Sequence, residues 1–153
     1  MCKNLLEKDY TIFVWDIRQD VMRSFEQHGA AVPESYADFV RNSDIILLSL
    51  PGPEEVKEAV IGEQGILAYK NQSQDITIFD FSTIDPITSK TISETCKINH
   101  VTYIDAPVSG GVAGARNRKL TFIIGAEKQE IAPFEHLLKD MGSTIFCVGK
   151  IGR

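Results

Sequence analysis

The sequence has 153 residues, of which 43% are hydrophobic and 24% charged, and its formal net charge is −5. A chain of this length predicts one domain with a substantial hydrophobic core. The sequence shows no basic stripe of the kind that binds nucleic acid, and no apolar run long enough to cross a membrane. The three cysteines form no Cys-x-x-Cys motif and no disulfide framework, which suits a reducing compartment.

Short apolar runs alternate with amphipathic stretches along the whole chain. Strands are predicted at residues 11–15, 44–50, 75–81, 101–105, 120–124 and 144–148. Helices are predicted at residues 1–8, 21–28, 36–42, 54–61, 86–98 and 127–141, with Ser35 and Asp85 as N-caps and Pro86 at a first helical position. This alternation predicts an α/β fold, a Rossmann-like, doubly wound and mostly parallel sheet.

Several strand ends carry residues that suit a cofactor crevice. Leu50 and Pro51 end one strand, and Thr83 follows the next, where it can reach the nicotinamide side. The carboxyl ends of parallel strands meet at one edge of a sheet, so these residues are predicted to line the same crevice. Asp16 follows the strand at 11–15, where a carboxylate would bind the adenosine ribose and favour NAD over NADP, although Arg18 softens that preference. The alternative is that Asp16 only begins a turn and Pro51 only terminates a strand.

A further strand end passes into a glycine-rich loop that contains Ser109, Gly110 and Gly111. A hydroxyl beside uncrowded backbone amides suits a small anion, but the glycines would serve turn geometry equally well. Neither a Gly-x-Gly-x-x-Gly loop nor a P-loop is present. A Ser/His/Asp hydrolase is disfavoured because Ser109 lies in Val-Ser-Gly rather than Gly-x-Ser-x-Gly. No His, Cys and Asp cluster has metal-ligand spacing, so no metal site is expected.

The run from Asp105 to Arg116 reads Asp-Ala-Pro-Val-Ser-Gly-Gly-Val-Ala-Gly-Ala-Arg. Together with the Leu-Thr-Phe that begins at Leu120, it resembles the substrate-binding signature of the β-hydroxyacid dehydrogenases, most closely their 3-hydroxyisobutyrate dehydrogenase branch. The segment from Phe81 to Ser89 and the Asn-Leu-Leu that begins at Asn4 match the same family. The related 6-phosphogluconate dehydrogenases have a similar Ser-Gly-Gly but a different lead-in.

This resemblance implies an NAD(P)-dependent oxidation of a small 3-hydroxy acid to its semialdehyde, or the reverse reduction, as in valine catabolism. NAD is the expected cofactor and NADP the alternative. The resemblance also implies a homo-oligomeric parent protein in the cytoplasm or the mitochondrial matrix. The positions that it assigns are Ser109, Gly110 and Gly111 for the substrate's carboxylate and hydroxyl, and Leu50, Pro51, Glu55 and Thr83 for the cofactor.

The chain also departs from the family pattern at both ends. Family members begin with a strand and a Gly-x-Gly-x-x-Gly loop, and Met1 corresponds to a position in the helix after that loop. The family's catalytic lysine corresponds to a position beyond Arg153, and Lys150 does not match it. Residues 1–153 are therefore expected to form a partial cofactor domain, without the helical C-terminal domain and without dehydrogenase activity of its own. The alternatives are a non-catalytic binding or interaction module of the same family, and a reductase of succinic or tartronic semialdehyde.

Overall fold

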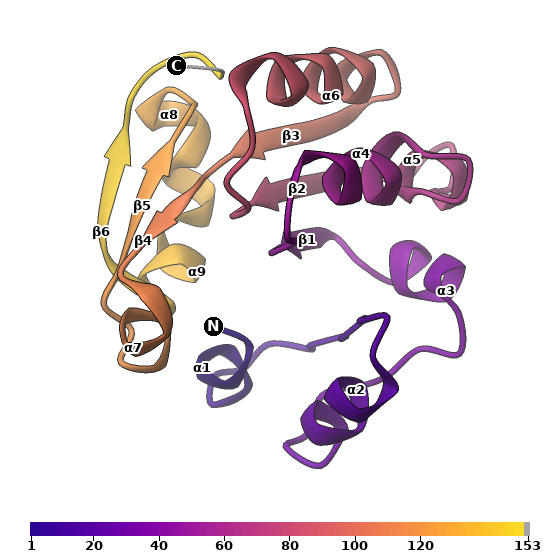
Figure 1. Ribbon diagram of the computed structural model, residues 1–153, viewed down its shortest axis with the longest axis vertical. Helices are drawn as coiled ribbons and strands as arrows, with labels where there is room; N and C mark the ends of the chain where they lie inside the picture. The colour runs from indigo at the N-terminus through magenta and orange to yellow at the C-terminus, as the bar shows by residue number, and fades with distance from the viewer. Residues whose placement is uncertain (152–153) are drawn as a thin grey trace.

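In the computed structural model, which describes residues 1–151, two three-stranded sheets are surrounded by helices (Figure 1). The first sheet has the order β1-β2-β3, formed by Ile45–Leu48, Ile76–Asp80 and Val101–Asp105. The second has the order β4-β5-β6, formed by Val108–Ser109, Leu120–Ile124 and Gly142–Cys147. The helices are α1 (Cys2–Leu6), α2 (Gln19–Glu26), α3 (Tyr36–Arg41), α4 (Pro53–Ile61), α5 (Ile66–Tyr69), α6 (Pro86–Ile98), α7 (Gly111–Arg116), α8 (Lys128–Ile131), the 3-10 helix η1 (Ala132–Phe134) and α9 (Glu135–Lys139).

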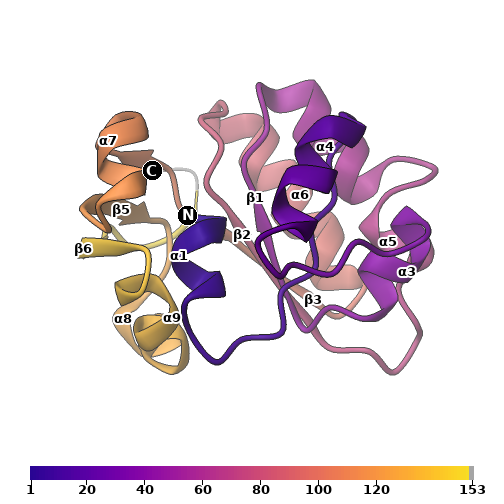
Figure 2. The same ribbon diagram turned by 90° about the horizontal axis from the view of Figure 1, so that it is seen from below.

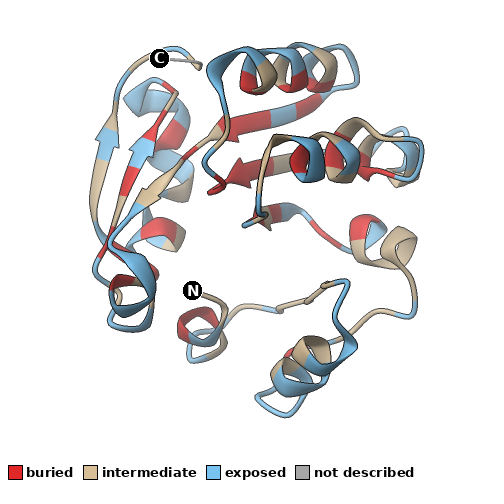
Figure 3. Cartoon of the chain, in the orientation of Figure 1, coloured by how far each residue is buried: buried red, intermediate tan, exposed pale blue. Residues whose placement is uncertain are grey.

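The first sheet is parallel and apolar on both faces, as its sequence predicts. On one face, Ile78 packs in a buried cluster with side chains of α4 and α6, such as Val56 and Ile92. On the other face, Phe79 packs in a second cluster that includes Leu138 of α9. Figure 3 shows the buried residues concentrated on the strands and on the inner sides of the helices. Helices thus cover both faces, and the doubly wound arrangement is confirmed.

The second sheet continues the first through the residues that follow β3. The Gly125 N–H donates to the Asp105 carbonyl at 2.8 Å, and the Ile123 N–H donates to the Pro107 carbonyl at 3.0 Å. The chain reverses through α7, so β5 runs antiparallel to β4, whereas β5 and β6 are parallel. The strict parallel alternation therefore ends at β3, although most strand pairs in the two sheets are parallel.

The predicted strand at residues 11–15 is wrong. It reduces to one bridge between Phe13 and Ala31, with hydrogen bonds that link Ala31 to Ile12 and Val14. A single paired residue cannot form a ladder, although the segment stays extended. Its apolar character reflects packing instead, because Ile12 lies against the cluster that contains Leu5.

The predicted helix at 127–141 is interrupted, because Pro133 has no backbone N–H to donate and the middle of the segment tightens into η1.

The two N-caps are confirmed: Ser35 accepts from the Asp38 N–H at 3.1 Å, and Asp85 accepts from the Thr88 N–H at 2.9 Å. None of the helices in residues 1–151 combines the length and the apolar character that crossing a bilayer requires. Gly152 and Arg153 lie outside the described residues. They are the last residues before the position at which the family resemblance places the lysine.

Candidate functional site

The carboxyl ends of β1, β2 and β3 are aligned. Leu48 is paired with Asp80, and Asp80 with Asp105, so the chain leaves all three strands at one edge of the sheet. The Leu50 N–H donates to the Ser82 hydroxyl at 2.9 Å, which joins the first two strand ends directly. The structure therefore brings the strand ends that carry Leu50 and Thr83 together.

The predicted cofactor residues at this edge are accessible. Pro51 and Thr83 are exposed, and Leu50 is half-buried. Glu55 is exposed in the first turn of α4, and its carboxylate turns back to the residue before the helix: a Cβ placed on Gly52 would lie 3.2 Å from Glu55 Oε2. Glu55 is thus placed beside the turn that follows β1, where its negative charge complements the helix N-terminus.

A buried polar network lies beneath this edge. Asp80 is 0% exposed, and it accepts hydrogen bonds from the Tyr103 hydroxyl at 2.6 Å and from the Ser82 N–H at 3.0 Å. Burial and the nearby Asp80 carboxylate raise the pKa of Tyr103, so its hydroxyl remains a donor. Burial also raises the pKa of Asp105 to about 6, an effect that the neighbouring Ser89 hydroxyl opposes and Asp80 reinforces. Sequence reasoning missed this network, although a carboxylate inside the apolar run of β2 is a visible signal.

Ser109, Gly110 and Gly111 lie at the end of β4 and the start of α7. All three are exposed. Gly110 has φ +129° and Gly111 has φ +60°, conformations that L side chains rarely adopt. The sequence predicted a loop here, and the structure differs because this pair of glycines turns the chain directly into a short helix. Both positions therefore require glycine because of their backbone conformation, and both residues are exposed.

Helix α1 holds α7 in place. Asn4 is buried, and its side-chain amide donates to the Ala115 carbonyl of α7 at 2.7 Å. Glu7, which follows α1, forms an ion pair with Arg118, which follows α7. Figure 2 shows α1 beside the second sheet, where Leu5 packs in the core. This support spans more than a hundred residues of sequence, so no local pattern could have predicted it.

The hydrogen bond and the ion pair of Asp16 lie within its own turn. Its Oδ1 accepts from the Arg18 N–H at 2.8 Å, and the Arg18 Nε lies 3.5 Å from the same oxygen. The turn that the sequence allowed therefore exists. It also orients the carboxylate toward Arg18, which supplies a positive charge beside it.

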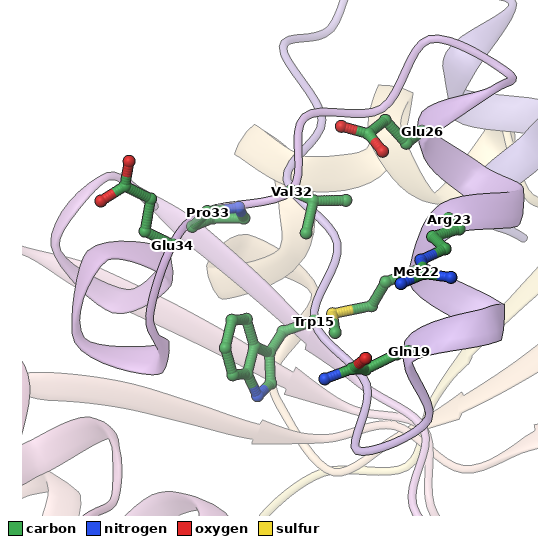
Figure 4. Close-up of a pocket in the computed structure, with 8 residues that line it drawn as sticks. All are labelled: Trp15, Gln19, Met22, Arg23, Glu26, Val32, Pro33 and Glu34. Atoms are coloured by element: carbon green, nitrogen blue, oxygen red, sulfur yellow. The ribbon is translucent and has the colours of Figure 1, made fainter.

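An open groove of about 300 Å³ lies on the α2 side of Asp16 (Figure 4). Trp15, Gln19 and Met22 lie close together in it, while Glu34 points away from the indole ring. None of the residues that line the groove comes from β1, β2 or β3. The groove is therefore separate from the strand-end edge, and the half-buried Trp15, which precedes Asp16, lines it.

Other kinds of site find no support in the described residues. Within residues 1–151, no group of three or more His, Cys, Asp or Glu side chains could hold a metal ion. In the same range no hydrogen bond joins Ser109 to a histidine: His28 contacts the Ser24 carbonyl, and His136 lies 3.6 Å from Asp140. A Ser/His/Asp triad is thus not assembled in this part of the chain.

Comparison with known proteins agrees with this geometry. A family model described as the NAD binding domain of 6-phosphogluconate dehydrogenase matches residues 1–149. The mitochondrial 3-hydroxyisobutyrate dehydrogenase of Mus musculus is 36% identical over 152 residues, which cover 99% of this chain and 45% of that protein. The chain thus spans about half the length of the curated relatives that it matches.

Solved structures show the same fold. A Mycobacterium tuberculosis 3-hydroxyisobutyrate dehydrogenase with L-serine superposes with a TM-score of 0.88 at 25% identity, over 99% of this chain and 50% of that one. A structure of Psf3 in complex with NADP+ and 2-OPP superposes with a TM-score of 0.90 at 24% identity, over 99% of this chain and 53% of that one, and shows the fold alone. The resemblance expected from the run that begins at Asp105 is confirmed, and the chain belongs to the family of NAD-binding domains of 6-phosphogluconate dehydrogenase.

Proposed function

We propose that this chain is the cofactor-binding part of an NAD-dependent oxidoreductase that interconverts a small 3-hydroxy acid, of the 3-hydroxyisobutyrate type, and its semialdehyde. The observation that supports the proposal is the position of Ser109, Gly110 and Gly111, three exposed residues where β4 turns into α7. The names of the relatives support the substrate class.

The residues at the strand ends fit a dinucleotide. Pro51 and Thr83 offer an accessible edge, and Asp16 offers a carboxylate to the two ribose hydroxyls. That carboxylate would repel a 2′-phosphate, so NAD is preferred, while Arg18 reduces the difference from NADP. When bound, the nicotinamide accepts or supplies the hydride. Glu55 lies close enough to the turn after β1 to make a further polar contact.

The substrate side is assigned to the loop that begins at Ser109. Its hydroxyl and the amides of Gly110 and Gly111 would bind the carboxylate and the hydroxyl of a 3-hydroxy acid, since accessible donors suit both groups. The alcohol proton needs a base, and the family resemblance assigns this base to a lysine beyond Arg153. We therefore propose that residues 1–153 are a partial domain that binds cofactor without turning over substrate, and that the whole protein is homo-oligomeric. Its compartment is proposed as the cytoplasm or the mitochondrial matrix, and the mitochondrial relatives favour the latter.

The substrate assignment is tested on the whole protein by following NADH absorbance with 3-hydroxyisobutyrate, L-serine, succinic semialdehyde and tartronic semialdehyde. We expect 3-hydroxyisobutyrate to have the highest kcat/KM. The Ser109→Ala variant should raise its KM about 10- to 100-fold, the usual loss for a hydrogen bond to a charged group. The matched control is Ser143→Ala, which removes an equally exposed strand hydroxyl. Turnover of the semialdehydes alone would favour the reductase, and no turnover of any of them would favour a non-catalytic module.

A further inference from the structure

The carboxylate of Asp80 is the most deeply buried charged group at the strand-end edge. It closes β2, whose other residues are Ile76, Thr77, Ile78 and Phe79. A buried carboxylate is costly unless hydrogen bonds satisfy it. Here the two oxygens have separate donors: Oδ1 accepts from the Ser82 N–H and Oδ2 from the Tyr103 hydroxyl. An apolar side chain would fill this position at a lower cost, so the carboxylate needs another explanation.

The hydrogen bonds continue from Asp80 to the neighbouring strand end. Ser82 is buried, and its hydroxyl accepts from the Leu50 N–H at 2.9 Å. Tyr103 comes from β3, Asp80 from β2, and Leu50 follows β1. Three connected hydrogen bonds therefore link the middle of β3 to the carboxyl end of β2 and to the residue two positions after the end of β1. The exposed residues Pro51 and Thr83 lie directly after the two ends that Ser82 joins.

We propose that Asp80, acting through Ser82, is a positioning residue that sets the spacing between the Leu50–Pro51 turn and the Ser82–Thr83 turn for the nicotinamide half of the cofactor. This inference rests on the proposed function. A ligand that contacts both turns at once loses affinity when either turn shifts, because contacts must be made in a single geometry. Both Asp80 and Ser82 have buried side chains, so we expect them to affect cofactor binding through the position of these turns and not by direct side-chain contact.

The first test is amide hydrogen exchange measured by NMR on this chain. The Ser82→Ala variant removes the acceptor of the Leu50 N–H, so exchange at Leu50 should accelerate about 5- to 30-fold, as for the loss of one hydrogen bond. Exchange at Ile78 in the strand core should not change. The Ser82→Thr variant keeps the hydroxyl and should restore slow exchange at Leu50. Unchanged exchange at Leu50 in Ser82→Ala would overturn the proposal, whether or not the chain binds cofactor.

The second test is NADH affinity, measured by calorimetry on the same variants. Ser82→Ala should weaken binding about 5- to 30-fold, and Asp80→Asn combined with it should add less than about twofold, because residues in one network are not additive. The matched control is Ser43→Ala, which removes another buried hydroxyl, one that donates to the Phe39 carbonyl in α3, and it should bind like the unmodified chain.

The NADH measurements distinguish failure of the positioning role from failure of the proposed function. If the unmodified chain binds NADH and Ser82→Ala binds it as tightly as Ser43→Ala does, the positioning role is refuted while the proposed function stands. If the unmodified, folded chain binds no NADH, the proposed function fails and this inference fails with it. Accelerated exchange at Leu50 together with weaker NADH binding is the result that supports the proposal.

Discussion

Replacing Asp105 by asparagine should make the protein more stable at neutral pH. Asp105 closes β3 next to the fully buried Asp80, and burial raises the pKa of its carboxyl from 3.8 to about 6. The folded state therefore holds this proton more tightly than the unfolded state does. Well below the usual pKa of 3.8, at about pH 3, both states are protonated and the carboxyl carries no penalty. As the pH rises toward 6, the unfolded state loses its proton first and stability falls.

The size of this penalty follows from the shift. One pKa unit corresponds to about 1.4 kcal/mol, so a shift of this size sets a ceiling of about 3 kcal/mol. Asp105 is only partly buried, and solvent screening reduces the expected cost to about 1–2 kcal/mol. Asp105→Asn lacks the titrating group, so its free energy of unfolding should exceed that of the unmodified chain by this amount near pH 7 and should match it at about pH 3.

Urea unfolding followed by circular dichroism across this pH range measures the difference directly. The control is Glu63→Gln, which makes the same change in charge at an exposed position and should shift stability by less than about 0.5 kcal/mol at any pH. A free energy gap for Asp105→Asn that is the same at about pH 3 and pH 7, or that grows as the pH falls, would refute the reasoning.

Two further predictions concern the support of the loop that begins at Ser109, and a third concerns turnover. Asn4→Ala removes the side-chain donor to the Ala115 carbonyl and should lower the free energy of unfolding in urea by about 1–3 kcal/mol. Glu7→Ala breaks an exposed ion pair and should lower it by less than about 1 kcal/mol. Equal losses in the two variants would contradict the role of α1 in supporting α7. Gly110→Ala should destabilise more than Gly111→Ala by the same assay, because φ +129° is harder for alanine than φ +60°. The 153-residue chain should show no NADH-linked turnover of 3-hydroxyisobutyrate, and measurable turnover would remove the need for a distant base.

The sequence predicted the elements whose signals are local. The strands β1, β2 and β3 were visible as apolar runs, and the caps Ser35 and Asp85 were visible as side chains that can accept the first free N–H groups. The meeting of the strand ends followed from the parallel order alone. The break at Pro133 was predictable in principle, since proline cannot continue a hydrogen-bonded helix, but the long amphipathic pattern concealed it.

The features that the sequence did not predict depend on contacts between residues that are distant in the chain. The apolar run at residues 11–15 looks like a strand, yet a strand needs a neighbour along its length, and within residues 1–151 this run has a single bridge, from Phe13 to Ala31. The bond from Asn4 to Ala115 and the bond from Tyr103 to Asp80 join residues that are distant in sequence. Neither follows from spacing or composition, and both support candidate site residues without belonging to the motif that identified them.

We propose that this chain binds NAD at the strand ends, with Asp16 at the adenosine ribose. The most direct test is a titration of the chain with NADH and with NADPH, followed by the fluorescence of Trp15, which lies next to Asp16 in an open groove. We expect saturable quenching with a lower Kd for NADH than for NADPH, and a smaller difference between the two Kd values in Asp16→Ala. A folded chain that shows no saturable change with NADH, or that binds NADPH as tightly as NADH, would contradict this proposal.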